Sequence, residues 1–491
     1  MKKSLLLLIT LLYFFKSYSQ SSEFIINKKE TFNEELKFVS KNDKNLILRK
    51  IAEKKRVYLC YFSPETLTKN SEKEIKFPTI NEEITKFENL FYFKNRICLF
   101  TSDFNKNEKY KSLYVTEYND NGEIITPAKE IDNIKWTNKN FRVRFEVSLS
   151  NDSSKILIYH MLDEYDDEKT LGKISFKVLD EKLNVIVKKG IELEKKFDNY
   201  ELSNFLLDKN NNIFYIENKG EENSKKEYLH KVSIVSYNSI NDKITKTEIN
   251  INENRFLSFD LQLTKQENIL ITGAYAIDRD FNGSWKDMSS LKGLFCSLID
   301  TKSNNVIVKH KKDIDTLIAG DKKFLKFGNT AMLNDGKHLY RYRLKNTFQL
   351  DNDQVVLLVQ FEHSINGSYV KGPIVGVNFN LKDEQNSWLN FYPFHETKKN
   401  ETNNKETFSY SAFKSNNKIN VIYNFNRHME ISSTGDFTDN EMFIESKENK
   451  NMFLSKYFLP SNNNELYILG TEGNLGADFV NYSICKIKFK K

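Results

Sequence analysis

Proline is rare in this chain, and linkers of small polar residues are missing. The 491 residues include six prolines, and no Ser/Gly/Pro-rich stretch separates one part of the chain from another. A chain of this length usually forms two or three domains. Without linkers between them, one large continuous domain is the better interpretation.

Cysteine is also scarce. The four cysteines, Cys60, Cys98, Cys296 and Cys485, each lie within an apolar stretch. None has the CxxC spacing of a metal site, so we expect buried free thiols. A disulfide between Cys60 and Cys485 remains the alternative, because closure of a ring-shaped fold brings the two ends of a chain together.

Clusters of cations and long apolar runs are absent beyond the N-terminus. The formal net charge is +7, but lysine, aspartate and glutamate alternate finely along the whole chain. A nucleic-acid-binding protein gathers its cations into a patch or stripe, so nucleic acid is not an expected partner. No later stretch approaches the roughly 20 apolar residues of a membrane helix, so we expect no transmembrane segment.

The first 19 residues have the layout of a secretory signal peptide. Two lysines precede an apolar run at residues 5–15, and the small residues Ser17 and Ser19 stand just before Gln20. We therefore expect residues 1–19 to be removed and the mature chain to be exported, to the periplasm, the outer surface or the extracellular space.

A β-rich pattern occurs eight times along the chain: an aromatic-apolar strand, a polar turn and a stronger apolar strand. The turns of these hairpins centre near residues 43, 95, 152, 210, 266, 352, 416 and 462. A second hairpin generally follows, as at 172–188 and 229–246. Repeats of about 45–65 residues with four strands each are typical of propeller blades. The pattern predicts an all-β fold, a β-propeller of seven or eight four-stranded blades.

The strands themselves support packing of sheet against sheet. Residues 156–159, 269–275 and 355–359 are continuous apolar runs, which fit strands covered on both faces. Asn-rich turns such as 119–122 and 210–212 tolerate the left-handed backbone that hairpin turns require.

The last repeat ends one strand short. It has its first hairpin and then only NYSICKIKF (481–489), so we expect FIINKKETF (24–32) to supply the fourth strand. The two chain ends would then close the propeller, and residues 20–491 would form a single domain with an insertion at 313–345. Tandem β-sandwiches are the alternative, but they predict linkers and a Trp or Cys framework that the sequence lacks.

Several phrases resemble those of a known group. They are the Ser-Gln end of the leader, LYRYRLKNTFQLDNDQVVLLVQFEH (339–363), KGPIVGVNFNLKDEQNSWLNFYPFHET (371–397) and a GAY…KGLF pairing at 273–275 and 292–295. The chain is similar in these to uncharacterised exported β-propeller-like proteins of Bacteroidetes-type bacteria. The resemblance implies the fold and export, and it carries no activity or site residue.

One local pattern suggests calcium. The run DxDxNG at 278–283 begins like a Ca²⁺ loop, in which carboxylate and carbonyl oxygens surround the ion. Lys286 and Ser289 then stand where such a loop needs its last ligands. We therefore expect a solvated turn there.

Histidine and tryptophan give weaker indications. The seven histidines are dispersed: His160, His230, His310, His338, His363, His395 and His428. His160 and His363 follow matching strands, and acids at 163–168 follow His160, so a metal site there is weighed against a solvated loop. Core packing is favoured over sugar stacking for the three tryptophans, which are Trp136, Trp285 and Trp388.

The sequence names no catalytic, cofactor-binding or metal-binding residue, and no cofactor is expected. It has no GxSxG elbow and no Gly-rich phosphate loop. An enzyme is therefore not favoured. Our hypothesis is an exported binding or scaffolding protein that contacts a protein or glycan of the cell envelope. The alternatives are a propeller hydrolase or lyase acting on a polysaccharide or peptide, and a structural envelope protein.

Overall fold

Every regular element in the described part of this computed structural model is a β-strand. The description covers residues 23–488 except 27–29, 33–34, 52–55, 137–140, 165–171, 194–199, 223–227, 252–255, 277–289, 315–338, 341, 352, 366–367, 384–387, 393–395, 399–409, 416, 424–426, 442–451, 462–464 and 473–479. The predicted signal peptide, 1–19, lies outside it. The chain divides into two compact units. Unit 1 is Met1–Glu74, Asn366–Tyr369 and Lys398–Lys491, and unit 2 is Ile75–Ile365 and Val370–Thr397.

Unit 2 contains five antiparallel sheets, which we number by their order in the chain. Sheet 2 is β9 (Lys86–Phe93), β10 (Arg96–Asn105), β11 (Tyr110–Tyr118) and β12 (Ile124–Lys135). Sheet 3 is β13 (Phe141–Leu149), β14 (Ile156–Glu164), β15 (Lys173–Leu179) and β16 (Val185–Glu192). Sheet 4 is β17 (Tyr200–Leu207), β18 (Ile213–Glu222), β19 (Tyr228–Asn238) and β20 (Lys243–Glu248). Sheet 5 is β21 (Phe256–Leu263), β22 (Ile269–Ala276), β23 (Ser290–Ile299) and β24 (Val306–Asp313), with β25 (Leu339–Tyr340) beside β23. Sheet 6 is β26 (Tyr342–Gln349), β27 (Gln354–Ile365), β28 (Ser368–Asn380) and β29 (Leu389–Tyr392), with β30 (Glu396–Lys398) beside β28. A short hairpin, β7 (Thr79–Ile80) and β8 (Glu83–Ile84), precedes sheet 2.

Unit 1 contains three sheets. Sheet 1 is β3 (Glu35–Lys41), β4 (Leu46–Ile51), β5 (Val57–Phe62) and β6 (Lys69–Ile75). Sheet 7 is β31 (Ser411–Ser415), β32 (Lys418–Tyr423), β33 (Arg427–Ile431) and β34 (Phe437–Glu441). Sheet 8 is β35 (Met452–Ser461), β36 (Glu465–Glu472), β37 (Val480–Lys488) and β1 (Glu23–Ile26), with β2 (Glu30–Phe32) also on β37. The first four strands of sheets 1 to 7 pair consecutively. Strands β1 and β2 on β37, β25 on β23 and β30 on β28 pair with strands that are not their neighbours in the chain.

Polar residues at the first position of the hairpin turns explain why the strands reverse where they do. Asp180 accepts hydrogen bonds from the backbone N–H groups of Lys182 and Asn184, at 2.9 and 2.8 Å. Leu183, inside this turn, has a left-handed φ of 60°. A short side chain that satisfies the turn's own backbone favours reversal over a continued strand. The same role falls to Asn42, Asn119, Ser150, Asp208, Thr264, Asp300, Asn380 and Ser432.

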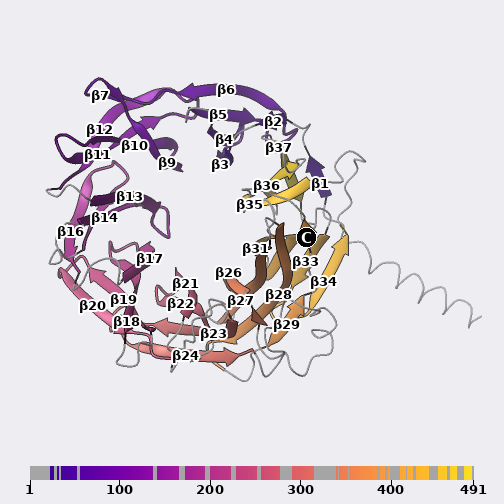
Figure 1. Ribbon diagram of the computed structural model, residues 1–491. Coiled ribbons are helices and arrows are strands. Elements are labelled where there is room, and N and C mark those ends of the chain that lie inside the picture. The colour runs from indigo at the N-terminus through magenta and orange to yellow at the C-terminus, as the bar shows by residue number, and fades with distance from the viewer. Residues whose placement is uncertain are drawn as a thin grey trace, which may run out of the picture. The chain divides into compact units, whose positions relative to one another are not determined.

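The core of unit 2 lies between neighbouring sheets. Separate apolar clusters join sheet 2 to sheet 3, sheet 3 to sheet 4, sheet 4 to sheet 5 and sheet 5 to sheet 6. The second strand of each sheet is covered on both faces, so residues 355–359 of β27 are all buried. The fourth strands expose much of one face, and β16 alternates between exposed and half-buried side chains from Ile186 to Glu192. Figure 1 shows β16, β20 and β24 at one margin of unit 2 and β13, β17 and β21 at the other.

The two ends of the chain build one sheet of unit 1. Strand β1 pairs antiparallel with β37, with Glu23 opposite Lys488 and Ile26 opposite Cys485. An apolar cluster joins sheet 8 to sheet 1, and β35 also lies against β31 of sheet 7. The predicted strand donation by residues 24–32 is therefore present in β1 and β2.

A buried lysine fixes sheet 8 to sheet 1. The side chain of Lys486 is fully buried, and its ammonium donates to the carbonyl oxygen of Pro64 at 3.1 Å. The Glu465 carboxylate lies 3.2 Å from the same ammonium. Burial by itself lowers the pKa of Lys486, but the hydrogen bond to Glu465 and the negative charges of Glu465 and Glu65 outweigh it and raise the pKa above the usual value. Lys486 is therefore a cation at physiological pH.

The sheets follow the hairpins that the repeated pattern of the sequence predicts. All eight first hairpins occur at the expected turns, and each belongs to its own four-stranded sheet. The all-β class and the number of repeats are thus confirmed. The single-domain boundary at 20–491 stays a prediction. Of the expected insertion at 313–345, residues 315–338 lie outside the described part, while β25 pairs with β23 and β26 begins at Tyr342.

Candidate functional surface of unit 2

Many residues that the sequence singled out lie outside the described part. These are the run at 278–283 with Trp285, Lys286 and Ser289, and also His338 and His395. His230 and His363 lie in β19 and β27. The metal interpretations of 278–283 and of His160 with His363 stay untested.

His160 contacts an acid other than the ones that follow it in the sequence. Its Nδ1 lies 3.1 Å from Asp132 Oδ2, and Lys177 Nζ lies 2.5 Å from the other carboxylate oxygen. Phe145 packs edge-on against the imidazole, with ring centroids 5.7 Å apart. Burial raises the pKa of Asp132, but hydrogen bonds from His160 and Lys177 outweigh it and lower the pKa below the usual value. These three side chains hold β12 of sheet 2 to β14 and β15 of sheet 3.

Side-chain amides hold the first strands of neighbouring sheets together. Asn89 donates to the carbonyl of Val147 at 2.9 Å, and Asn204 donates to the carbonyl of Phe259 at 3.3 Å. Both asparagines lie at β-bulges, which turn a side chain out of the regular alternation. The sequence alone gave no signal for these bonds, because they depend on the register between sheets.

The corresponding seam between sheets 5 and 6 includes a half-buried acid, Asp260. Gln262 donates to Asp260 Oδ2 at 2.8 Å and to the carbonyl of Thr347 at 3.0 Å. The Oγ1 atoms of Thr272 and Thr347 are 2.9 Å apart. Burial raises the pKa of Asp260, and the hydrogen bonds to it oppose that shift only in part. The polar side chains of this seam therefore hydrogen-bond to one another and hold sheet 5 against sheet 6.

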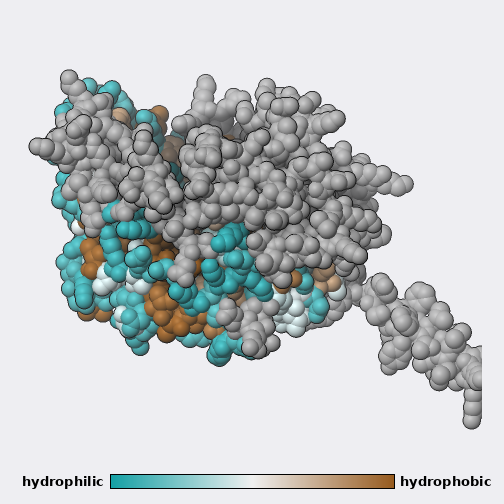
Figure 2. Space-filling view, turned by 60° about the horizontal axis from the view of Figure 1, so that its bottom comes forward, coloured by the Kyte–Doolittle hydropathy of each residue, from teal (hydrophilic) through white to brown (hydrophobic). Residues whose placement is uncertain are grey.

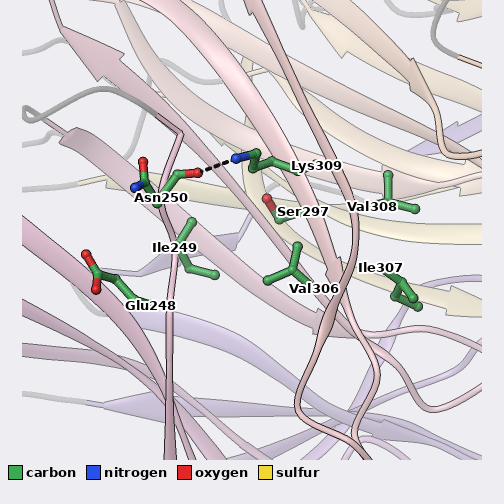
Figure 3. Close-up of a pocket in the computed structure, with 8 residues that line it drawn as sticks. All are labelled: Glu248, Ile249, Asn250, Ser297, Val306, Ile307, Val308 and Lys309. Atoms are coloured by element: carbon green, nitrogen blue, oxygen red, sulfur yellow. Dashed lines mark hydrogen bonds between the residues drawn. The ribbon is translucent and has the colours of Figure 1, made fainter.

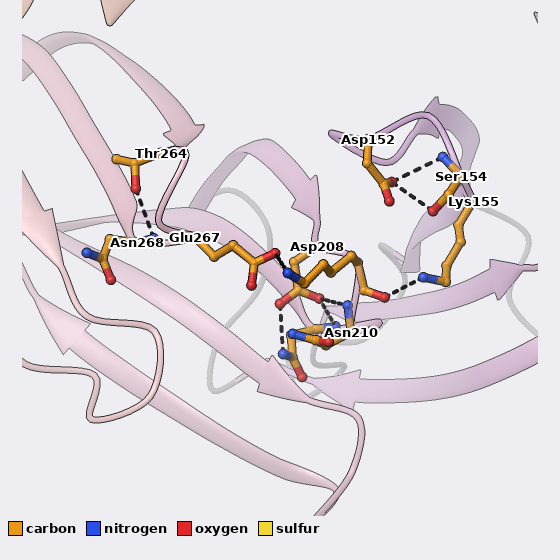
Figure 4. A network of polar contacts seen from close by, with 10 residues as sticks. Asp152, Ser154, Lys155, Asp208, Asn210, Thr264, Glu267 and Asn268 are labelled. Carbon is orange, nitrogen blue, oxygen red and sulfur yellow. Dashed lines mark hydrogen bonds and ion pairs between the residues drawn. The ribbon is translucent and has the colours of Figure 1, made fainter. Parts of the chain in front are cut away.

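The first-hairpin turns of sheets 3 to 6 form a polar network, part of which Figure 4 shows. Lys155 donates to the carbonyl of Lys209 at 2.5 Å, and Lys209 Nζ lies 2.7 Å from Glu267 Oε1. Lys265 and Asp351 continue it at 3.1 Å. Exposed ion pairs contribute little each, so this network orders the turns more than it stabilises the fold.

Three of the fourth strands expose a pair of apolar residues just after the turn of the second hairpin. Ile124 and Ile125 are 59% and 54% exposed, and Val306 and Ile307 are 39% and 54% exposed. Val185 and Ile186 are the corresponding pair of β16. Figure 2 shows apolar patches of this kind among hydrophilic side chains. Exposure of β-branched residues at the same place in three sheets is not expected of a purely solvated margin.

A cleft lies between sheets 4 and 5 next to one of these pairs (Figure 3). Its volume is about 330 Å³, at the lower end of the about 300–1,000 Å³ of ligand pockets. Residues Glu248 to Asn250 form one wall and Val306 to Lys309 the other. Lys309 Nζ donates to the carbonyl of Asn250 across the cleft, at 2.8 Å. Ser297 of β23 is fully buried and also lines it.

The cysteines are unreactive in this structure. All four are free and buried, so the alternative bridge between Cys60 and Cys485 is not formed. Burial raises the pKa of Cys60 and of Cys98 to about 12. Thiols that stay protonated are poor nucleophiles and poor ligands.

Trp136, metal-ligand clusters and membrane helices complete the features that the sequence raised. Trp136 is buried and stacks on Phe104 with ring centroids 5.6 Å apart, as expected of a core aromatic. Within the described ranges, no group of three or more His, Cys, Asp or Glu side chains is placed to hold a metal ion. The same ranges contain no helix with the length and apolarity needed to cross a bilayer.

No family model and no curated protein sequence matches the chain. Among solved structures it is similar to a Dos1 propeller, with 8% identity over 94% of both chains and a TM-score of 0.44. It is also similar to the WD40 domain of SCAP from fission yeast, with 8% identity over 96% of this chain and 99% of that chain, and a TM-score of 0.40. It is similar to the polysaccharide lyase Uly1 as well, with 11% identity over 96% of this chain and 100% of that chain, and a TM-score of 0.40. Similarities this weak define neither a family nor an activity.

Proposed function

We propose that the chain is an exported β-propeller that binds a protein or glycan of the cell envelope. In this proposal the eight sheets are the blades, and sheet 8, built from both chain ends, closes the ring. Two features support that arrangement. Neighbouring sheets of unit 2 pack in chain order, and sheet 8 of unit 1 contacts both sheet 7 and sheet 1.

The observation that carries the binding function is the exposed apolar margin of unit 2. Three of its fourth strands expose apolar pairs, namely β12, β16 and β24. A large apolar side chain in water costs free energy that a partner recovers by covering it. At β24 the pair also lines the cleft, which gives a partner a concave place to bind.

Photo-crosslinking in the source cell tests this function. A photoreactive phenylalanine placed at Ile307 or at Ile186 should crosslink to an envelope macromolecule, whereas the same group at the exposed Thr434 of sheet 7 should not. The exported chain should begin at Gln20, as mass spectrometry of its N-terminal peptide will show. A chain that keeps its leader in the cytoplasm, or equal crosslinking at all three positions, would contradict the proposal.

A further inference from the structure

The cleft runs along the free edge of strand β24. Successive side chains of a regular strand point to opposite faces, yet Val308 and Lys309, which follow the register shift at Ile307, both line it. A cleft lined by both faces of a strand follows that strand's edge. Within the described part, β24 is the last strand of sheet 5, with β23 on one side and no strand on the other. Its outward N–H and C=O groups therefore face the cleft.

The side chains along this edge change from apolar to basic. Val306 and Ile307 are exposed at its start, and Lys309 and Lys311 are exposed beyond them. On the opposite wall Ile249 is buried and supplies an apolar base. A partner that matches this order carries apolar side chains beside acidic ones.

A buried hydroxyl marks the floor of the cleft. Ser297 lies opposite Lys309 in the ladder between β23 and β24. Its Oγ is buried and has no hydrogen-bond partner among the described residues. A buried hydroxyl left without a partner is unfavourable, and a polar group entering the cleft removes that cost.

We infer that an extended segment of a partner protein, with alternating apolar and acidic side chains, adds as a fifth strand to the free edge of β24. Backbone hydrogen bonds to β24 supply affinity, and the apolar pair and the lysines supply specificity, as in other cases of strand addition. This inference rests on the proposed binding function and names the partner's chemistry.

A synthetic peptide tests the inference directly. The probe is a fluorescein-labelled nine-residue peptide of alternating glutamate and valine, measured by fluorescence anisotropy with the mature protein. It should bind, and two controls should bind at least tenfold more weakly: a lysine/valine peptide, and the glutamate/valine peptide N-methylated at alternate residues. The first control tests charge and the second tests backbone hydrogen bonding.

Matched protein variants locate the site. Ile307→Glu and the pair Lys309→Glu with Lys311→Glu should each weaken binding at least tenfold, and the charge-swapped pair should gain affinity for the lysine/valine peptide. Val185→Glu on β16 is the control, because Val185 is 45% exposed and does not line the cleft. Unchanged melting temperatures confirm that the exposed substitutions leave the fold intact.

Three results would overturn the inference. In the first, the glutamate/valine peptide does not bind. In the second, Val185→Glu weakens peptide binding as much as Ile307→Glu does. In the third, the protein associates with itself and Ile307→Glu abolishes that association, which assigns the edge to a second copy. If the peptide fails to bind while the crosslinks at Ile186 and Ile307 persist, the strand-addition mode is wrong and the binding function stands. If both fail, both proposals are wrong.

Discussion

Replacing Gly293 with alanine should strongly destabilise the protein. Gly293 lies in β23 between Tyr275 and Asp313, its neighbours in the two flanking strands. A methyl group there would collide with the Tyr275 ring and with the backbone carbonyl of Lys312. The ring is held in place because its hydroxyl donates to Asp313 at 2.5 Å. Overpacking of a core costs about 1–3 kcal/mol, and we expect a loss of about 3 kcal/mol because one obstacle is backbone.

Gly190→Ala is the matched control for this substitution. Gly190 lies in β16, and a methyl group there would meet nothing closer than Ser175 Oγ at 3.6 Å, an ordinary contact. Alanine also restricts the unfolded chain more than glycine does, so stability should stay equal or rise slightly. Urea unfolding followed by tryptophan fluorescence measures both variants. Equal losses at the two positions would show that the packing described around β23 is wrong.

Replacing Lys486 with methionine should loosen the sheet that both chain ends build. The substitution keeps the shape of most of the side chain but removes its ammonium. Glu465 then loses its buried cation, and the Pro64 carbonyl keeps only the hydrogen bond from the Tyr467 hydroxyl. Removal of one partner from a fully buried ion pair costs about 3–5 kcal/mol. Because Glu465 keeps 15% exposure, we expect a smaller loss of about 2–3 kcal/mol.

An exposed ion pair of the same unit provides the comparison. Lys418 lies 2.8 Å from Glu430, and its side chain is 47% exposed. Lys418→Met should therefore cost less than about 1 kcal/mol. Thermal unfolding should be measured for Lys486→Met, for Lys418→Met and for the double variant Lys486→Met with Glu465→Gln. The double variant separates the loss of the buried ion pair from the cost of leaving the Glu465 charge without its cation. The double variant should recover part of the loss, and equal stability of Lys486→Met and the wild type would refute the role given to the buried lysine.

The strands could be predicted from the sequence because their signals are local. A hairpin needs two apolar runs and a polar turn within about 20 residues, and Asp180 or Asp208 caps the turn that follows it in the chain. The chain ends were predictable for a similar reason, since the last repeat visibly lacked one strand. The continuous apolar run at 355–359 correctly indicated a strand covered on both faces.

The contacts between sheets could not be predicted in this way. The partner of His160 is Asp132, which precedes it by 28 residues on another sheet, whereas the sequence drew attention to the acids that follow it. The bond from Asn89 to Val147 likewise depends on how two sheets slide against each other. The cleft beside β24 could not be predicted either, because apolar residues such as Val306 and Ile307 are ordinarily expected to be buried in a strand.

Small-angle X-ray scattering of the mature protein tests most directly the proposal that the eight sheets form one closed ring of blades. A single compact body of this length should have a radius of gyration of about 23 Å. The Lys486→Met variant should show a larger radius of gyration only under conditions in which sheet 8 has separated from sheet 1. A wild-type value above about 30 Å, with an elongated distance distribution, would show two units joined in line and contradict the ring.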